Sequence, residues 1–357
     1  MRIALVHDWI IYEGGAERVL QSLHRLWPDA PIFTLLYQPE TVRRLLPNAT
    51  IRPSRLQRLP GAWRYYPLLA PLMPSAIETF DFSAFDTVIS SSVVFSKGII
   101  VRPDTRHLSY CYSPTRSIWD RAHRYQRTGI LSHVYRHLLR SWDLAAAQRP
   151  DHLLAISNTT AARITKYYHR SSIVVPPPMR AHATPDYTRV PADAYYLVVG
   201  RLIAHKDLEI VIDAFAKLRC RLVIVGEGTL FRQLQRRSQT NIVFVGRVTD
   251  AQLDGLYDRC TALIVPNEED WGLTAVEAMS HGKPVLALRR GGATETVLEG
   301  ITGEFFDDAI PEAIADGVKR ITAGLSSYDA SHITNHASQY GEEQFARRMK
   351  AIVELPS

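Results

Sequence analysis

Residues 196–266 read YLVVGRLIAHKDLEIVIDAFAKLRCRLVIVGEGTLFRQLQRRSQTNIVFVGRVTDAQLDGLYDRCTALIVP. Short apolar runs typical of buried strands recur along this stretch, at 196–200, 221–226, 242–246 and 262–266. Three segments with the apolar spacing of helices lie between them. The first covers 208–218, the second ends near Ser238 and the third covers 250–259. This alternation of strands and helices predicts a doubly wound α/β domain with a parallel sheet.

The first half of the chain shows the same alternation. Apolar runs predict strands at 3–6, 32–36, 87–90, 107–110 and 152–157. Helical spacing begins at Ala16 and recurs over 130–147. A proline-rich stretch from Pro176 to Pro191 separates the halves, because proline fixes φ and lacks the N–H that a sheet requires. An amphipathic helix is predicted over 340–355.

We therefore predict two doubly wound, Rossmann-like domains that face each other across a cleft. The predicted boundaries are 1–178 for the first domain, 179–192 for a linker, 193–335 for the second domain and 336–357 for a C-terminal segment with the last helix.

Composition excludes several classes of protein. With 357 residues, 46% hydrophobic and 22% charged, the chain is neither disordered nor collagen-like, and it is long enough for two domains. No run of about 18 uncharged apolar residues occurs, so no membrane span is expected. Asp8 interrupts the N-terminus before a signal sequence could form. Three widely spaced cysteines predict neither a disulfide framework nor a zinc site.

Charge is distributed unevenly between the halves. Residues 1–180 contain 23 Lys and Arg against 12 Asp and Glu, whereas residues 181–357 contain 19 against 24. The basic first half suggests an anionic partner: a nucleic acid, a membrane surface or a diphosphate substrate. Only 7 of the 42 basic residues are Lys, a ratio that codon bias toward Arg also explains.

The most informative loop reads PNEEDWGLTAVEAM over 266–279. Glu269 lies directly after a predicted strand, and Glu277 follows about a turn into a helix that begins after Gly272. Ligands of doubly wound sheets bind at the carboxyl ends of the strands, and the first N–H groups of a helix attract phosphate. One carboxylate can therefore accept from sugar hydroxyls and the other from a ribose, with a diphosphate between them. Enrichment of acidic residues near a helix start explains Glu268 and Asp270 without function.

Three further loops follow predicted strands. In Gly200–Lys206, two cations, Arg201 and Lys206, are placed to hold the two phosphates of a nucleotide, unless the loop is simply solvated. Gly14-Gly15 allows a ligand to approach the backbone closely, although a tight turn explains this pair equally well. Gly291-Gly292 offers the same close approach beside a possible sugar. No G-x-G-x-x-G occurs, which disfavours a nicotinamide enzyme.

Together these motifs resemble the retaining GT-B glycosyltransferases of family 4. Residues 269–277 are similar to that family's E-x7-E signature, Arg201 and Lys206 to its diphosphate-binding pair, and residues 6–19 to its N-terminal glycine loop. The resemblance covers essentially the whole chain. It implies a GT-B fold, a nucleotide-diphospho-sugar donor bound by the C-terminal domain, an acceptor bound by the N-terminal domain, and a last helix that packs back on the N-terminal domain.

The resemblance also assigns residues. Arg201, Lys206 and Glu269 would act directly in catalysis, with Arg201 and Lys206 on the diphosphate and Glu269 on the donor sugar. Further donor contacts are implied for Gly15, Glu227, Val248, Gly272, Leu273, Thr274 and Glu277, of which Glu277 holds the ribose and Glu227 and Val248 border the base. The family is thought to use the leaving phosphate as the base, so no protein nucleophile, metal or cofactor is expected. No D-x-D motif occurs.

On the acceptor side, the candidates are His7, Asp8, Gly14, Tyr112 and Arg116. One departs from the pattern, because a related subgroup often has histidine where Tyr112 stands. A phenol donates a hydrogen bond but carries no charge at neutral pH. His107 could substitute, although a hydrogen-bonded strand histidine is the simpler reading.

The segments VHDW at 6–9 and PTRSIWD at 114–120 resemble those of mannosyltransferases that use GDP-mannose. This resemblance implies a lipid-linked (polyprenyl-diphosphate) or polysaccharide acceptor. A nucleotide-sugar epimerase, another GT-B enzyme and a non-catalytic GT-B-like binding protein remain alternatives. Nucleic-acid binding is not expected, since no recognition motif appears. Residues 52–74 alternate arginines with aromatic and aliphatic residues, which suits an anionic membrane surface or, alternatively, an ordinary core segment. The predicted location is cytoplasmic, peripheral at the inner face of the cell membrane.

Overall fold

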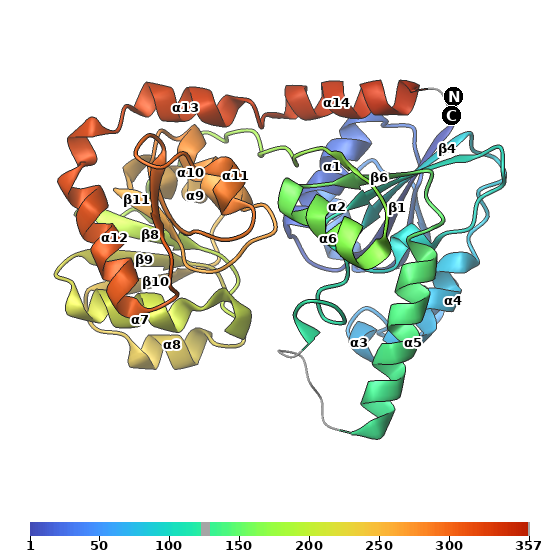
Figure 1. Cartoon of the computed structure of the whole chain (residues 1–357), viewed down its shortest axis with the longest axis horizontal. Coiled ribbons are helices and arrows are strands. Elements are labelled where there is room, and N and C mark those ends of the chain that lie inside the picture. The colour runs from blue at the N-terminus through green and yellow to red at the C-terminus, as the bar shows by residue number, and fades with distance from the viewer. Residues whose placement is uncertain (123–128, 356–357) are drawn as a thin grey trace. The chain divides into compact units, whose positions relative to one another are not determined.

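The computed structural model describes residues 1–122 and 129–355, and the chain divides into two compact units (Figure 1). Unit 1 comprises Met1–Pro178 and Phe345–Ser357, and unit 2 comprises Met179–Gln344. Residues 175–194, which include the proline-rich stretch, form neither helix nor strand.

Unit 1 is built on a parallel sheet that has seven strands within the described residues, in the order β3-β2-β1-β4-β5-β6-β7. The strands are β1 (Ile3–Ile10), β2 (Ile32–Tyr37), β3 (Ile51–Pro53), β4 (Thr87–Ser92), β5 (Arg106–Cys111), β6 (His152–Ala155) and β7 (Ile173–Val174). The helices are α1 (Gly15–Leu26), α2 (Pro39–Leu45), α3 (Tyr66–Leu69), α4 (Met73–Glu78), α5 (Ile130–Ala146), α6 (Asn158–Tyr168) and most of α14 (Glu342–Glu354), with 3₁₀ turns η1 (Arg55–Arg58), η2 (Ala70–Leu72) and η3 (Ser96–Gly98).

Strand β1 runs four residues past the predicted end at Val6. His7 and Asp8 are fully buried in it. Neighbouring elements satisfy Nδ1 of His7 and the Asp8 carboxylate, whereas Nε2 of His7 has no hydrogen-bond partner within the part of the chain that the structure describes. The Asp8 carboxylate accepts from the backbone N–H groups of residues 93–96, over 2.5–3.0 Å. A charged side chain is tolerated in a buried strand under this condition, because its hydrogen bonds replace those of water.

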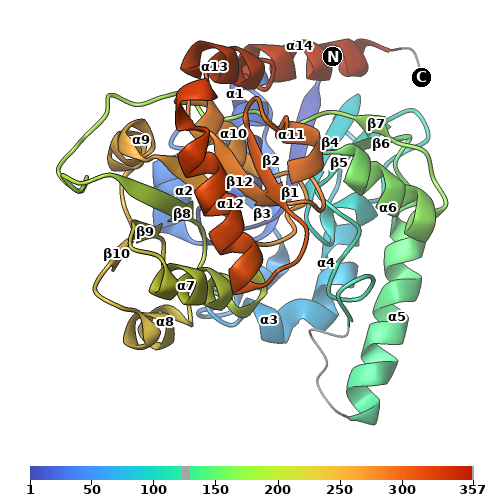
Figure 2. The same ribbon diagram turned by 60° about the vertical axis from the view of Figure 1, so that its left-hand side comes forward.

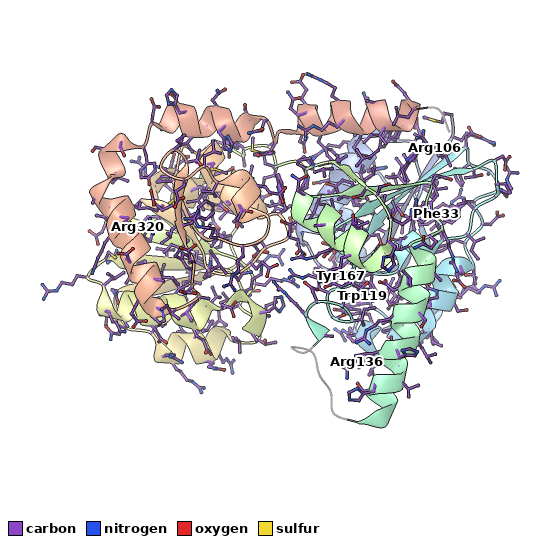
Figure 3. The ribbon with its side chains drawn as sticks, in the orientation of Figure 1. Phe33, Arg106, Trp119, Arg136, Tyr167 and Arg320 are labelled. Carbon is purple, nitrogen blue, oxygen red and sulfur yellow. The ribbon has the colours of Figure 1, made fainter. Side chains whose placement is uncertain are left out.

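Aromatic rings fill much of the unit 1 core. Phe33 on β2 packs against Phe80, Phe82 and Phe85, with ring centroids 4.7–5.8 Å apart. Elsewhere in this unit, Trp119 stacks on Tyr167 of α6 at 5.1 Å (Figure 3). Such pairs stabilise a core beyond the burial of their area.

The last helix, α14, completes unit 1. Phe345 packs edge-on against Tyr110 of β5, with a centroid distance of 5.9 Å. Arg106, at the start of β5 (Figure 3), donates from Nη1 to the carbonyls of Val353 and Leu355, at 3.0 and 2.6 Å. These carbonyls lie at the end of the helix, where no backbone N–H is available to them, so the guanidinium caps α14.

Unit 2 is built on a second parallel sheet, with six strands among the described residues, in the order β10-β9-β8-β11-β12-β13. The strands are β8 (Tyr195–Val199), β9 (Arg221–Val225), β10 (Ile242–Gly246), β11 (Ala262–Val265), β12 (Val285–Leu288) and β13 (Gly303–Phe306). The helices are α7 (Leu208–Lys217), α8 (Phe231–Arg237), α9 (Asp250–Arg259), α10 (Leu273–Ser280), α11 (Ala293–Thr296), α12 (Pro311–Ala323) and α13 (Ala330–Ser338), with the 3₁₀ turn η5 (Ala204–Lys206).

Alternating strand residues form the core of unit 2. Tyr196 and Val198 of β8 join Leu222 and Ile224 of β9 in one apolar cluster with Phe215 of α7. Helices α7 and α12 pack together over this face, and Figure 2 shows both. The predicted fold class, two doubly wound parallel α/β domains, is confirmed by the two sheets. In each sheet the strand order reverses once, between β1 and β4 and between β8 and β11. Ligands of such folds bind at these reversal points.

Across the described residues, no helix combines the length and the apolar character that crossing a bilayer requires.

Candidate functional site

The loops after β8 and β11 converge at the carboxyl edge of the unit 2 sheet. Lys206, at the end of η5, forms an ion pair through Nζ with Oε1 of Glu269. The same oxygen accepts from the Asn267 amide at 3.0 Å. Both charged side chains are largely but not fully covered, with 20% and 25% of their surfaces exposed. The pair therefore lies at the surface, within reach of a ligand.

A narrow pocket opens beside this ion pair. Its lining includes Gly200, Arg201, Lys206, Glu269 and Thr274. The sequence placed these residues in two different loops, and the structure brings them together around one cavity. Arg201 is exposed in the loop after β8 and lines the pocket.

Helix α10 begins at this pocket. Gly272 precedes it with φ of 96°, a left-handed conformation that a side chain would strain. Leu273 and Thr274 are its first two residues, and such N–H groups have no acceptor within the helix. They carry the positive end of the helix dipole, which favours a phosphate near Lys206 and Arg201.

The loop that carries Glu269 is held from behind by Gly291-Gly292. Gly292 N–H donates to the Glu269 carbonyl at 2.8 Å. A Cβ on Gly291, whose φ is +66°, would lie 2.2 Å from that carbonyl oxygen, and one on Gly292 would lie 2.4 Å from the Cα of Trp271. These glycines therefore serve close backbone packing of the loop.

A second pocket, of about 390 Å³, lies at the ends of β9 and β10. It is lined by Glu227, Gly228, Thr229, Phe231, Arg232 and Gly246. Glu227, predicted to border the base, is exposed in it, and Val248 is half-buried two residues beyond Gly246. The pocket offers an aromatic ring and both signs of charge, which suits a planar base.

Glu277 is positioned differently from Glu269. It is 7% exposed, and its Oε2 accepts from the Tyr257 hydroxyl of α9 at 3.0 Å. Its Oε1 lies 3.6 Å from Nε of Arg180. Burial and the Glu277 charge both raise the pKa of Tyr257, so its hydroxyl stays protonated and donates. Sequence reasoning identified Glu277 but neither of these two partners.

In unit 1, His7 and Tyr112 meet at Ser91 of β4. Nδ1 of His7 lies 3.0 Å from both the carbonyl and the hydroxyl oxygen of Ser91. A carbonyl only accepts, so Nδ1 carries a proton. The Tyr112 hydroxyl contacts Ser91 Oγ at 2.8 Å and donates to the Ala16 carbonyl at 3.0 Å. Nε2 of His7 points toward Glu17, which is itself buried on α1, at 3.9 Å.

The remaining acceptor-side candidates are held by neighbouring groups. Gly14 precedes α1 and Gly15 begins it, with a Cβ on Gly14 only 2.8 Å from the Glu17 carboxylate. Arg116 pairs with Asp120 at 2.9 Å. Both oxygens of Asp8 are occupied by backbone N–H groups, as described above. His107 is fully buried beside Ser90, and burial, with a smaller effect of Arg149, lowers its pKa to about 3.

The segment that carries Arg116 is anchored by a buried acid on α5. Asp143 accepts from Thr115 Oγ1 at 2.9 Å, from Trp119 Nε1 at 2.7 Å and from the Tyr168 hydroxyl at 2.8 Å. Its charge is matched by Lys97, whose Nζ lies 2.7 Å away and whose side chain is 1% exposed. This cluster fixes residues 115–119 but offers no access to a ligand.

Residues 179–332 match the model of the family described as Glycosyl transferases group 1. That segment is nearly the whole of unit 2. The O-antigen chain mannosyltransferase C of Escherichia coli is 27% identical over 173 residues, 44% of this chain and 45% of that protein. The alpha-1,3/1,6-mannosyltransferase alg-2 of Neurospora crassa is 24% identical, over 87% of this chain and 78% of that protein. The first curated relatives are matched over only 32% to 46% of their own length.

Solved structures extend the likeness to both units. Anabaena HepE in complex with UDP has a TM-score of 0.74 and 18% identity, with 99% of each chain covered. Identity this low shows the fold alone. This structural likeness and the two parallel α/β units together identify the fold as GT-B.

Proposed function

We propose that this chain is a retaining glycosyltransferase that moves mannose from GDP-mannose to a lipid-linked or polysaccharide acceptor. The observation that carries the proposal is the Lys206–Glu269 pair, beside Arg201 and the first N–H groups of α10. This arrangement puts two cations and a helix N-terminus where a diphosphate can bind, with a carboxylate where its sugar would lie. The mannosyltransferase names among the relatives favour mannose as the sugar.

Each group has a defined task in this proposal. Arg201 and Lys206 hold the diphosphate, and Lys206 keeps Glu269 in reach because an ammonium has three donor hydrogens. Glu269 accepts from hydroxyls of the donor sugar, Glu277 accepts from the ribose, and the pocket at Glu227 takes the guanine.

In the reaction, the bond from the sugar C1 to the diphosphate oxygen breaks while the acceptor oxygen bonds to C1 on the same face. The acceptor proton passes to the leaving diphosphate oxygen, so no protein base is required. Arg201, Lys206 and the α10 dipole stabilise the charge that develops on the diphosphate. We propose no metal or cofactor, and turnover is expected to be unchanged by EDTA.

The test is transfer from GDP-mannose by the purified full chain, followed as GDP release with and without lipid-linked or polysaccharide acceptors. Acceptor-dependent release with retained configuration supports the proposal. Conversion of the donor to an epimer without any acceptor would show an epimerase. Binding of GDP without turnover of any donor and acceptor combination would show a binding protein. GDP should raise the thermal midpoint by mass action, whereas guanosine should not.

The acceptor, we propose, is met at an anionic membrane by unit 1. A basic apolar surface there consists of Arg55, Arg58, Arg64, Leu59, Tyr65, Leu68 and Leu72, all exposed. Leu68 is 74% exposed, far more than a leucine whose side chain packs in a core. Cations alternating with apolar side chains suit the head-group boundary of a bilayer.

Helix α5 of the same unit also exposes apolar residues. Val134 and Leu138, one helical turn apart, are 51% and 61% exposed. Helices α4 and α5 lie side by side, since Trp142 donates to Glu78 at 3.0 Å (Figures 1 and 2).

Sedimentation with liposomes tests the membrane proposal. Binding to anionic vesicles should weaken with salt and be lost when Arg55, Arg58 and Arg64 become Ser and Leu68 becomes Ser. Leu69 is unsuitable, because it packs against the core. The matched control replaces three exposed arginines outside the surface, Arg43, Arg44 and Arg102. Equal recovery of the control and patch variants would refute this surface as the docking site.

A further inference from the structure

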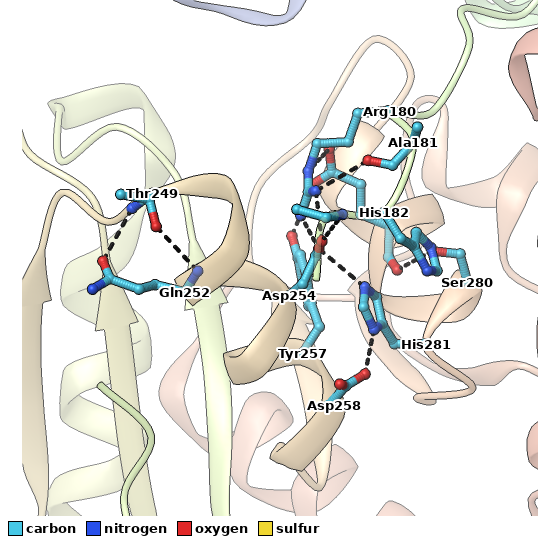
Figure 4. Close-up of polar contacts among 12 residues, drawn as sticks. Arg180, Ala181, His182, Thr249, Gln252, Asp254, Tyr257, Asp258, Ser280 and His281 are labelled. Atoms are coloured by element: carbon cyan, nitrogen blue, oxygen red, sulfur yellow. Dashed lines mark hydrogen bonds and ion pairs between the residues drawn. The ribbon is translucent and has the colours of Figure 1, made fainter. Parts of the chain in front are cut away.

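Charged and polar side chains of unit 2, most of them buried, form a cluster that includes Glu277 of α10. We call it the Arg180 cluster, and it comprises Arg180, His182, Asp254, Tyr257, Asp258, Glu277 and His281 (Figure 4). The proposed function uses Glu277 alone, so the purpose of the other members is unassigned.

The charges in this cluster alternate. Arg180 donates from both terminal nitrogens to the two carboxylate oxygens of Asp254, one of these contacts at 3.0 Å. Nε2 of His281 lies 3.2 Å from Asp254, and its Nδ1 lies 2.5 Å from Asp258. Carboxylates accept, so both ring nitrogens of His281 carry protons. Although burial lowers the pKa of His281, the hydrogen bonds to the two carboxylates outweigh it and raise the pKa.

Asp254 holds the Arg180 guanidinium in place through two hydrogen bonds. Burial alone would raise its pKa, but hydrogen bonds from His281, Arg180 and the Ala183 N–H hold the pKa well below its ordinary value. With Asp254 fully buried and ionised, the guanidinium has a single orientation. That orientation directs Nε, which is buried and has no hydrogen-bond partner, at Oε1 of Glu277 3.6 Å away.

Tyr257 contacts the other oxygen of the same carboxylate. Its hydroxyl donates to Oε2 of Glu277 at 3.0 Å, and the ring is fully buried. Glu277 is thus gripped at both oxygens, by a cation on one side and a neutral donor on the other. A carboxylate has about four lone-pair positions, so these contacts leave it able to accept from hydroxyls as well.

We propose that Arg180 and Tyr257 are positioning residues that hold the Glu277 side chain in one rotamer, and thereby set the preference of the donor site for ribose over deoxyribose. The inference rests on the proposed function. A site can discriminate ribose from deoxyribose only if the carboxylate that accepts from the ribose hydroxyl is fixed in place. A mobile carboxylate can turn away to water, so binding a sugar that lacks this hydroxyl would cost it no hydrogen bond. Neither residue needs to touch the nucleotide.

The test compares affinity for GDP and 2′-deoxy-GDP, and for UDP and 2′-deoxy-UDP, by calorimetry on the full chain. Wild type should prefer the ribonucleotide about tenfold or more, as expected for a hydrogen bond to a charged group. Tyr257→Phe should weaken ribonucleotide binding, leave deoxyribonucleotide binding unchanged and so reduce the preference. Arg180→Lys, which keeps the charge, should reduce the preference less than Arg180→Gln.

Tyr195→Phe is the matched control. Tyr195 is also a buried tyrosine, and its hydroxyl donates to the carbonyl of Leu256 on the same helix, at 2.8 Å, rather than to Glu277. The control should keep the full preference. In a Glu277→Gln background, Tyr257→Phe should have no further effect on the preference, because it acts only through that carboxylate.

The outcomes separate the two levels of the proposal. An undiminished preference in folded Tyr257→Phe and Arg180→Gln overturns the positioning role while leaving the nucleotide site intact. Equal binding of ribo- and deoxyribonucleotides by wild type overturns the role of Glu277 itself. Absence of any nucleoside diphosphate binding overturns the proposed function along with the inference.

Discussion

Replacing Lys206 by Met tests the diphosphate site most directly. Methionine keeps the length and apolar stem of the side chain but removes the ammonium that pairs with Glu269. A charge-assisted hydrogen bond to phosphate contributes about 1.5–3 kcal/mol, which corresponds to an affinity loss of about tenfold to about 150-fold. GDP and GDP-mannose should both bind that much more weakly, whereas guanosine, which lacks phosphates, should bind as before.

Folding should change little in this variant. Both partners are partly exposed, and pairs of that kind contribute about 0–1 kcal/mol. The thermal midpoint should therefore shift by about 4 °C at most. Lys217→Met is the matched control, since that ammonium pairs with Glu312 at 2.7 Å on an exposed surface of the same unit.

Calorimetric titration with GDP and with guanosine provides the measurement. The wild-type GDP affinity should also fall with added salt, and the Lys206→Met affinity should fall less steeply. If GDP binds equally well to wild type, Lys206→Met and Arg201→Met, the two cations do not hold a diphosphate and the proposed donor site is wrong.

Three further changes test other parts of the structure. Glu269→Ala should lower turnover at least tenfold, or about 1.4 kcal/mol, with a nearly unchanged thermal midpoint, and near-normal turnover would contradict its contact with the donor sugar. His281→Gln should be destabilising below about pH 6.5, where the protonated ring contributes fully, and the thermal-midpoint deficit should shrink as pH rises through the raised pKa of the folded state. The exposed His332→Gln serves as its control, and a pH-independent deficit would refute the charged ring. Arg106→Leu should release the end of α14 and cost unit 1 about 1–3 kcal/mol, read as a lower thermal midpoint; an unchanged midpoint would show that the cap is dispensable.

The sequence predicted the ends of β8, β9, β10 and β11 well, because the apolar runs there end at glycines or proline. It predicted that Lys206 and Glu269 would lie close to a common ligand, since the carboxyl ends of parallel strands meet at one edge. The bounds of the helix predicted over 250–259 agree with those of α9. Strand β1 extends past its predicted end, because the side chains of His7 and Asp8 form hydrogen bonds with buried groups.

Other parts of the site were not predictable from local pattern. Arg180 lies 74 residues before Asp254, and Tyr257 lies 20 residues before Glu277. No periodicity connects such positions, and their contacts arise only where the tertiary fold brings the Arg180 loop and α9 to Asp254 and Glu277. Asn267 could have been found, because a polar amide directly after a buried strand and before Glu269 is placed to contact the same ligand.

The return of residues 345–357 to unit 1 has a consequence for synthesis on the ribosome. Unit 2 is one continuous stretch, so all of its strands are available once residue 344 has emerged. Unit 1 begins first, but it lacks the contact of Phe345 with Tyr110 and the carbonyls that Arg106 binds until residues 345–355 have emerged. Until then, the nascent unit 1 has one part of its sheet uncovered. Unit 2 is translated later but can complete its core first.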